Sequence, residues 1–65
     1  MMSSYVEALL ERRVSRRNGT PEYLVRWGGF GAEEDSWEPA QGLPQDMTIA
    51  FDNEQKAERR AKRKR

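Results

Sequence analysis

The 65-residue chain contains no cysteine and no histidine. Without cysteine it can form neither disulfides nor thiolate zinc sites, and without histidine it lacks the commonest general base and metal ligand. Its serines have no adjacent base, and the acidic run 33–35 falls in one predicted loop, which suits a charge patch better than an acid/base pair. We therefore predict no catalytic residue, no metal, no cofactor and no enzymatic activity.

Long hydrophobic runs are also missing. The longest, Ala8-Leu9-Leu10, is far too short for a membrane-spanning helix or a signal peptide. Hydrophobic and charged residues each make up 35% of the chain, so a single small domain with a thin core is expected. We predict no membrane partner and, for the isolated domain, a monomer.

The formal net charge of +1 conceals an uneven distribution. Residues 1–55 carry five basic and ten acidic side chains, whereas residues 56–65 carry seven basic and one acidic. This pattern indicates an acidic domain followed by a basic tail.

Three short strands are predicted from residue types and turn signals. Residues 5–17 favour a strand, and Asn18-Gly19 is a strong hairpin signal because both residues tolerate positive φ. Residues 22–27 alternate and are rich in β-branched and aromatic side chains, which predicts a second strand. Residues 36–38 fit a third strand that stops at Pro39.

A C-terminal helix is predicted from Gln45 onward. Pro44 stands where helices begin, and Met47, Ala50 and Phe51 have helical spacing. Past Lys56 no large apolar residue remains, so we expect the helix to fray. The predicted class is α+β, a three-stranded antiparallel sheet covered by one helix. The predicted core is Leu10, Tyr23, Val25, Trp37, Leu43, Met47 and Phe51.

Two aromatic residues flank a glycine-rich loop that is followed by acids. Trp27 ends the second predicted strand, and Phe30 lies within Gly28-Gly29-Phe30-Gly31, just before the acidic run 33–35. Rings at a strand end and on a loop can converge into an open box, and neighbouring carboxylates favour a cation. A methylated ammonium group suits such a box, because it binds ring faces by cation–π attraction. The alternative from the residues alone is that both rings belong to the core.

Four segments together resemble a chromodomain. They are Val-Glu-Ala-Leu-Leu-Glu-Arg-Arg at 6–13, Glu-Tyr-Leu-Val-Arg-Trp-Gly-Gly-Phe at 22–30, Glu-Glu-Asp-Ser-Trp-Glu-Pro at 33–39, and Leu43. The resemblance covers residues 6–51. It is strongest to the heterochromatin-protein, Polycomb and chromodomain-Y-like classes and to the chromodomains of retrotransposon integrases.

This resemblance implies a curved, SH3-like three-stranded sheet with the helix packed across it. Together with the residue patterns it gives a flexible lead-in at 1–4, the chromodomain at 5–56 and a basic tail, as frayed helix or disordered chain, at 57–65. It also implies a nuclear reader of methylated-lysine histone tails, most often of histone three, acting in heterochromatin and gene silencing. The peptide would add as a β-strand while an aromatic cage reads the methylated side chain.

The resemblance further implies the site residues. Trp27 and Phe30 fall on two cage positions, and Glu34 falls on the acidic position beside them. The implied peptide-binding positions are Val6, Ser36, Glu38 and Gly42. Gly42 and Pro44 replace polar residues that clamp the peptide backbone in many relatives.

The third cage position is displaced by one residue. A gapless alignment puts Ser4 at the family's aromatic position and Tyr5 one place later. Such a slip turns a strand side chain to the other face, so either a bulge brings Tyr5 round or the cage has two rings. We predict Tyr5 as the third wall.

Two other functions remain open. The tail could bind DNA or RNA non-specifically; its candidate residues are Arg59, Arg60, Lys62, Arg63, Lys64 and Arg65. A second basic cluster, Arg12, Arg13, Arg16 and Arg17, is expected to be split between two faces by strand alternation. The serine at position 4 also leaves open a protein–protein module for arginine-rich peptides.

Overall fold

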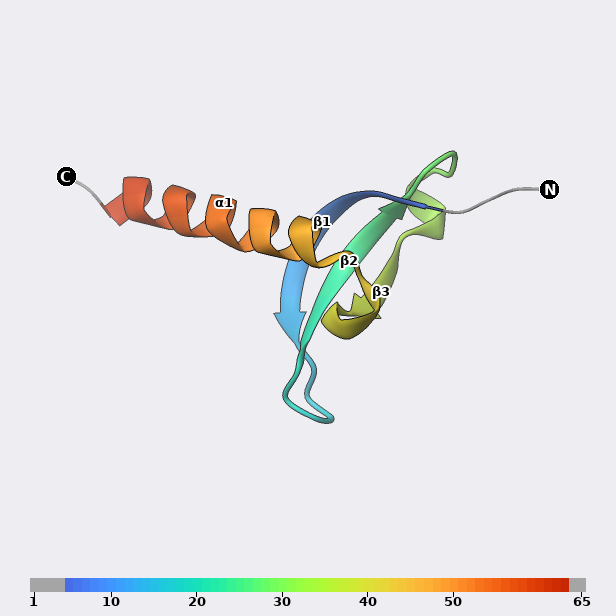
Figure 1. Ribbon diagram of the computed structural model, residues 1–65, viewed down its shortest axis with the longest axis horizontal. Helices are drawn as coiled ribbons and strands as arrows, with labels where there is room; N and C mark the ends of the chain where they lie inside the picture. The colour runs from blue at the N-terminus through green and yellow to red at the C-terminus, as the bar shows by residue number, and fades with distance from the viewer. Residues whose placement is uncertain (1–4, 64–65) are drawn as a thin grey trace.

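The computed structural model describes the backbone of residues 5–63 and the side chains of residues 5–58. Three strands form one antiparallel sheet in the order β1-β2-β3, and one long helix follows (Figure 1). The elements are β1 (Val6–Val14), β2 (Pro21–Trp27), the 3₁₀ turn η1 (Ala32–Glu34), β3 (Ser36–Pro39), the 3₁₀ turn η2 (Ala40–Gly42) and α1 (Gln45–Arg63). The predicted α+β class, with three antiparallel strands and a C-terminal helix, is confirmed.

Two bulges bend β1. Its pairing with β2 shifts register between Val6 and Ala8 and again between Leu9 and Glu11. Leu10 is the extra residue of the second bulge and is 39% exposed, while Leu9 packs against the core. The prediction of Leu10 as a core residue was therefore wrong, because an unpaired bulge residue changes which side chains face inward.

The buried core is small and centred on β2. Tyr23 and Val25 are 2% and 0% exposed, and Leu43 is 9% exposed. Phe51 packs against this cluster from α1, its ring edge-on to Tyr23 with the centroids 5.6 Å apart. The alternation of β2 thus sends Tyr23 and Val25 to one face, where the helix covers them.

Met47 and Trp37 are less buried than predicted. Both are half-buried and lie outside the core cluster. The Trp37 ring carries the guanidinium of Arg13 at 4.1 Å from its centroid, so a cation rather than apolar packing covers it.

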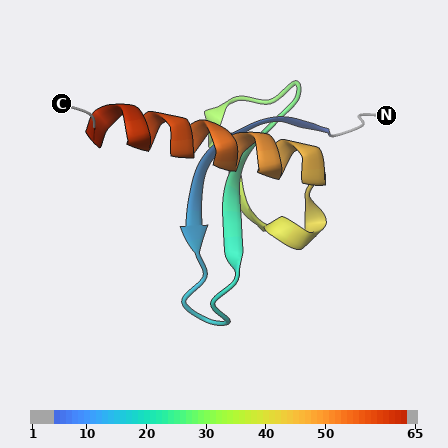
Figure 2. The same cartoon turned by 60° about the vertical axis from the view of Figure 1, so that its left-hand side comes forward.

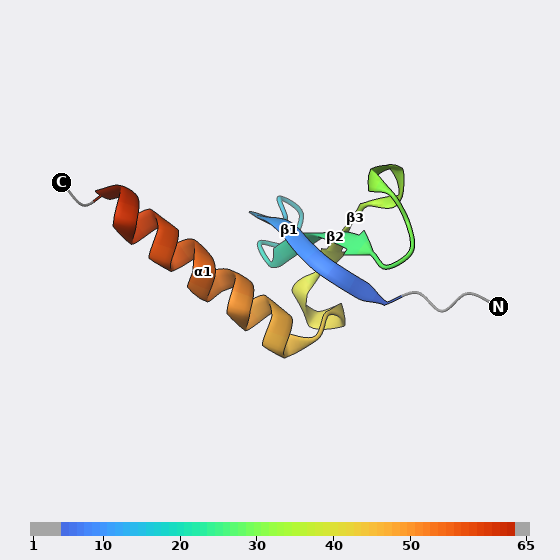
Figure 3. The same cartoon turned by 90° about the horizontal axis from the view of Figure 1, so that it is seen from above.

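The helix crosses the sheet near β1 and then continues beyond it (Figures 2 and 3). Its first turn is fixed by Pro44, whose carbonyl accepts the amides of Met47 and Thr48. Near the third turn, Asp52 accepts a hydrogen bond of 2.9 Å from the Tyr23 hydroxyl. α1 runs to Arg63, past Lys56, where we expected fraying. Of the part of the chain that is described, no helix is long and apolar enough to cross a membrane.

Candidate functional site

The loop after β2 brings Phe30 close to the strand end that carries Trp27. The Phe30 amide donates to the Trp27 carbonyl at 3.1 Å, which closes a tight turn. Gly29 has φ of 84°, a conformation that glycine adopts without strain. The glycine spacing therefore sets two half-buried aromatic residues three positions apart on one short turn.

Trp27 is held by a chain of two hydrogen bonds. Its indole Nε1–H donates to Ser36 Oγ at 3.0 Å, and the Ser36 hydroxyl donates to Glu38 Oε2 at 2.7 Å. Ser36 and Glu38 lie two residues apart on β3, so their side chains share one face of the sheet. Three of the sequence-predicted site residues are thus brought together, and their bonds fix how the indole is oriented.

Tyr5 is paired with Gly28. The Gly28 amide donates to the Tyr5 carbonyl at 2.9 Å, and the Tyr5 ring fills the space that a Cβ on Gly28 would need. The next pair along the ladder is Val6 with Trp27, and successive pairs face opposite sides of a sheet. Tyr5 is 60% exposed, and its ring lies over the glycine.

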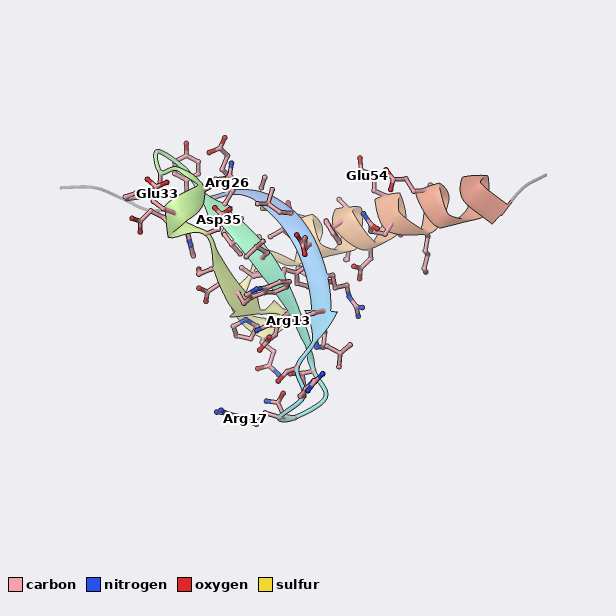
Figure 4. The ribbon with its side chains drawn as sticks, turned by 180° about the vertical axis from the view of Figure 1, so that it is seen from behind. Arg13, Arg17, Arg26, Glu33, Asp35 and Glu54 are labelled. Carbon is pink, nitrogen blue, oxygen red and sulfur yellow. The ribbon has the colours of Figure 1, made fainter. Side chains whose placement is uncertain are left out.

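The acidic run does not act as one patch. Glu33 and Glu34 are exposed on η1, whose turn is closed by the Glu34 amide donating to the Gly31 carbonyl at 3.0 Å. Asp35 instead binds Arg26 through two hydrogen bonds of 2.6 and 3.0 Å. These bonds from the guanidinium hold the pKa of Asp35 below its usual 3.8. Figure 4 shows this pair at the end of the sheet where η1 lies.

Sequence reasoning missed the Arg26–Asp35 pair. The register of β2 and β3 accounts for this pair. Val25 is opposite Ser36 in an antiparallel pairing, so the next residues, Arg26 and Asp35, approach each other. The pair connects η1 to the face of β2 opposite the buried Tyr23 and Val25, and so holds the turn that carries Glu34. Within the acidic run 33–35, Glu33 and Glu34 are the carboxylates that this ion pair does not occupy.

Of the remaining predicted peptide-binding residues, Val6 lies opposite Trp27 in the β1–β2 pairing, whereas Gly42 lies on η2. Val6 packs against the core cluster from β1. Gly42 ends η2 and is exposed, with nothing within 4 Å of the place of a Cβ. The predicted nucleic-acid residues of the tail lie outside the residues whose side chains are described.

The comparisons with known proteins agree with this architecture. The Chromo (chromatin organisation modifier) domain model matches residues 5–54, so the chain belongs to the chromodomain family. It is 47% identical to the chromodomain Y-like protein of Rattus norvegicus over 38 residues, which cover 58% of this chain and 6% of that protein. It is 42% identical to the chromobox protein homolog hpl-1 of Caenorhabditis elegans over 60 residues, 92% of this chain and 31% of that protein.

This family consists of chromatin-associated modules that are not enzymes. The resemblance inferred from the sequence is confirmed by the family match and by relatives of both the chromodomain-Y-like and chromobox types. The chain spans less than a third of the length of each of these relatives.

Proposed function

We propose that the chain reads methylated lysine in a histone tail, most often that of histone three, in nuclear chromatin. The observation that carries this proposal is the fixed indole of Trp27, whose Nε1–H is bonded to Ser36 beside the turn that holds Phe30. A methylammonium group needs ring faces that are already oriented, because ordering them on binding would consume part of the interaction energy.

Electrostatics supports the same ligand. Glu34 sits exposed on a turn that starts next to Phe30, and Asp35 in the same run is already bound by Arg26. Glu34 therefore attracts the cation while Asp35 holds the turn. Under this proposal Glu34 raises affinity for charged lysine side chains without contacting the peptide backbone.

The peptide would add as a strand between the segment around Val6 and the segment after β3. Its backbone would pair with both, Val6 would cover the peptide residue before the lysine, and Glu38 and Gly42 would flank its path. Gly42 offers no side-chain contact. Backbone pairing and the cage therefore supply most of the affinity.

The cage walls we assign are Trp27 and Phe30. The third wall, at Tyr5, stays a prediction: the ring covers Gly28 in this structure and would have to turn towards Trp27 to close the cage.

Calorimetric titration with histone-three peptides, unmodified or trimethylated at one lysine, tests the proposal. Trp27→Ala and Phe30→Ala should each lose most of the preference for the methylated form, about 2 kcal/mol or roughly thirtyfold. Ile49→Ala, an exposed apolar side chain on α1, is the matched control and should bind as the parent does.

A neutral analogue separates charge from shape. A peptide that carries a neutral tert-butyl group in place of the trimethylammonium group has the same shape without the charge. It should bind more weakly than the trimethylated peptide, because it lacks the cation–π attraction. Equal binding of methylated and unmodified peptides would refute the proposal. Tighter binding of an unmethylated arginine-rich peptide would favour the protein–protein alternative.

A further inference from the structure

The loop between β1 and β2 carries charge that the proposed function does not use. Between Glu11 and Glu22 the chain has four basic side chains and no carboxylate. This loop lies at the opposite end of β2 from the loop after Trp27 (Figure 1). Since β2 spans seven residues, the two ends are about 20 Å apart.

Two of the four arginines already have partners. Arg12 lies 3.7 Å from Asp52, and Arg13 Nε binds Glu22 at 2.8 Å while its guanidinium covers the Trp37 ring. Among the side chains of residues 5–58, none forms an ion pair with Arg16 or Arg17. These two guanidinium groups are therefore available to a ligand.

The loop that carries them has a defined shape. The Ser15 amide donates to the Thr20 carbonyl and the Gly19 amide donates to the Ser15 carbonyl, both at 2.8 Å. The Arg17 amide donates to Ser15 Oγ at 3.2 Å. Gly19 takes φ of 72°, as the Asn-Gly signal predicted, whereas Asn18 does not have a positive φ. Arg17 therefore extends from an ordered turn, at the tip of the hairpin in Figure 4.

The loop borders a surface hollow of about 720 Å³. Arg13, Arg16 and Arg17 line it together with Asn18, Thr20 and Glu22, and the Glu22 carboxylate is bound by Arg13. The expectation that alternation would split these arginines between two faces was wrong for Arg16 and Arg17, because both lie in the turn rather than on the strand.

The chemistry of this surface suits phosphate. A guanidinium is a planar fork that can bind two phosphate oxygens at once, and two adjacent forks match the repeated charges of a nucleic-acid backbone. The chain has a second basic run at 56–65, on a different element, which a long polyanion could contact at the same time. A short acidic peptide has no such reach.

We propose that the β1–β2 loop binds the phosphate backbone of double-stranded DNA through Arg16 and Arg17. Contacts of this kind are independent of base sequence and weaken steeply with salt. Because the loop and Trp27 are at opposite ends of β2, DNA and a histone peptide can bind together.

Fluorescence anisotropy of the full 65-residue chain with a labelled random-sequence duplex, over a salt series, tests this inference. Arg16→Ala/Arg17→Ala should lower affinity on the order of tenfold and reduce the slope of log K against log salt by about 2. Gln45→Glu/Asn53→Glu lowers the net charge by the same amount on exposed positions of α1 and should lose much less. In nuclear magnetic resonance titrations of the parent, the amides of residues 16–20 should shift on adding DNA.

Three results would overturn the assignment. An unchanged salt slope in Arg16→Ala/Arg17→Ala would exclude the loop, and an equal loss in Gln45→Glu/Asn53→Glu would show that only net charge matters. Poly-glutamate competing as well as DNA at equal charge would assign the surface to acidic proteins instead. Retained binding of histone peptide by the double arginine variant would keep this result separate from the proposed function.

Discussion

The Trp27 indole Nε1–H donates a hydrogen bond to Ser36 Oγ at 3.0 Å, which joins the last residue of β2 to the first residue of β3. Since Ser36 also donates to Glu38 at 2.7 Å, one hydroxyl satisfies a ring donor and a carboxylate acceptor at once. The orientation of the proposed cage wall thus depends on a residue of the neighbouring strand.

Ser36→Ala should therefore lower both stability and methyl-lysine preference. Removal of the hydroxyl leaves the half-buried indole N–H without its partner, a cost of about 1–3 kcal/mol in the free energy of unfolding. Urea unfolding and peptide titration measure the two effects. Ser36→Thr keeps the hydroxyl and should retain both properties. A Ser36→Ala variant with the parent's stability and the parent's methyl preference would show that the bond has no such role.

The Arg26–Asp35 pair predicts sensitivity to acid. The bonds from Arg26 depress the pKa of Asp35 in the folded chain, so their stabilisation is complete above the ordinary value of 3.8. This stabilisation is lost as pH falls from 3.8 through the lower pKa that Asp35 has in the folded chain. Asp35→Asn should therefore be less stable than the parent at neutral pH, and the difference should shrink in strong acid. Thermal unfolding at several pH values measures this, with Glu54→Gln, an exposed carboxylate in the middle of α1, as the charge-matched control. A stability difference that stays constant in acid would contradict the prediction.

Much of the fold could be predicted because local signals agreed. Asn18-Gly19 set the hairpin, the alternation of residues 22–27 set β2, and Pro39 and Pro44 marked the ends of β3 and the start of α1. The chromodomain motif then added what local patterns cannot give, the packing of α1 on the sheet. These features depend on residue type and spacing, which the sequence states directly.

The failures came from features that depend on partners distant in sequence. The second bulge of β1 exchanged Leu10 for Leu9 in the core, and no local pattern announces a bulge. Arg13 covers Trp37 through a cross-strand contact, and Arg26 removes Asp35 from the acidic run in the same way. The composition of the site was accessible from the sequence, whereas the pairing of its charges required the register.

The contact of Tyr5 with Gly28 predicts a ring-current effect. Because the Tyr5 ring lies over the glycine, the Gly28 Hα resonances should be shifted upfield in the parent chain. Tyr5→Leu should return them towards random-coil values. In Gly28→Ala the new methyl group displaces the Tyr5 ring, so the amides next to residue 28 should also move towards random-coil values.

Titration of the parent with trimethylated peptide tests the third cage wall. If the peptide removes the upfield shift of Gly28, Tyr5 leaves the glycine on binding, as a third cage wall requires. A shift that persists in the complex would leave the cage with two rings.

Tyr23 predicts a loss of stability in alkali. Burial is the larger cause that raises its pKa above 10.0, and the hydrogen bond that its hydroxyl donates to Asp52 is the next. A raised folded pKa means that the stabilisation is complete below pH 10 and is lost as pH rises through the folded value.

Tyr5→Phe leaves Tyr23 as the only tyrosine, so phenolate absorbance then reports the titration of Tyr23 alone. Its midpoint should lie above 10, and adding Asp52→Asn should lower it, because the hydrogen bond to Asp52 and the charge of Asp52 both raise the pKa of Tyr23 while Arg12 lowers it. Tyr23→Phe should cost about 1 kcal/mol at neutral pH and remove part of the alkaline loss. A midpoint at or below 10 in the Tyr5→Phe chain would show that burial and Asp52 do not outweigh the opposing effect of Arg12, and would contradict the predicted loss of stability in alkali.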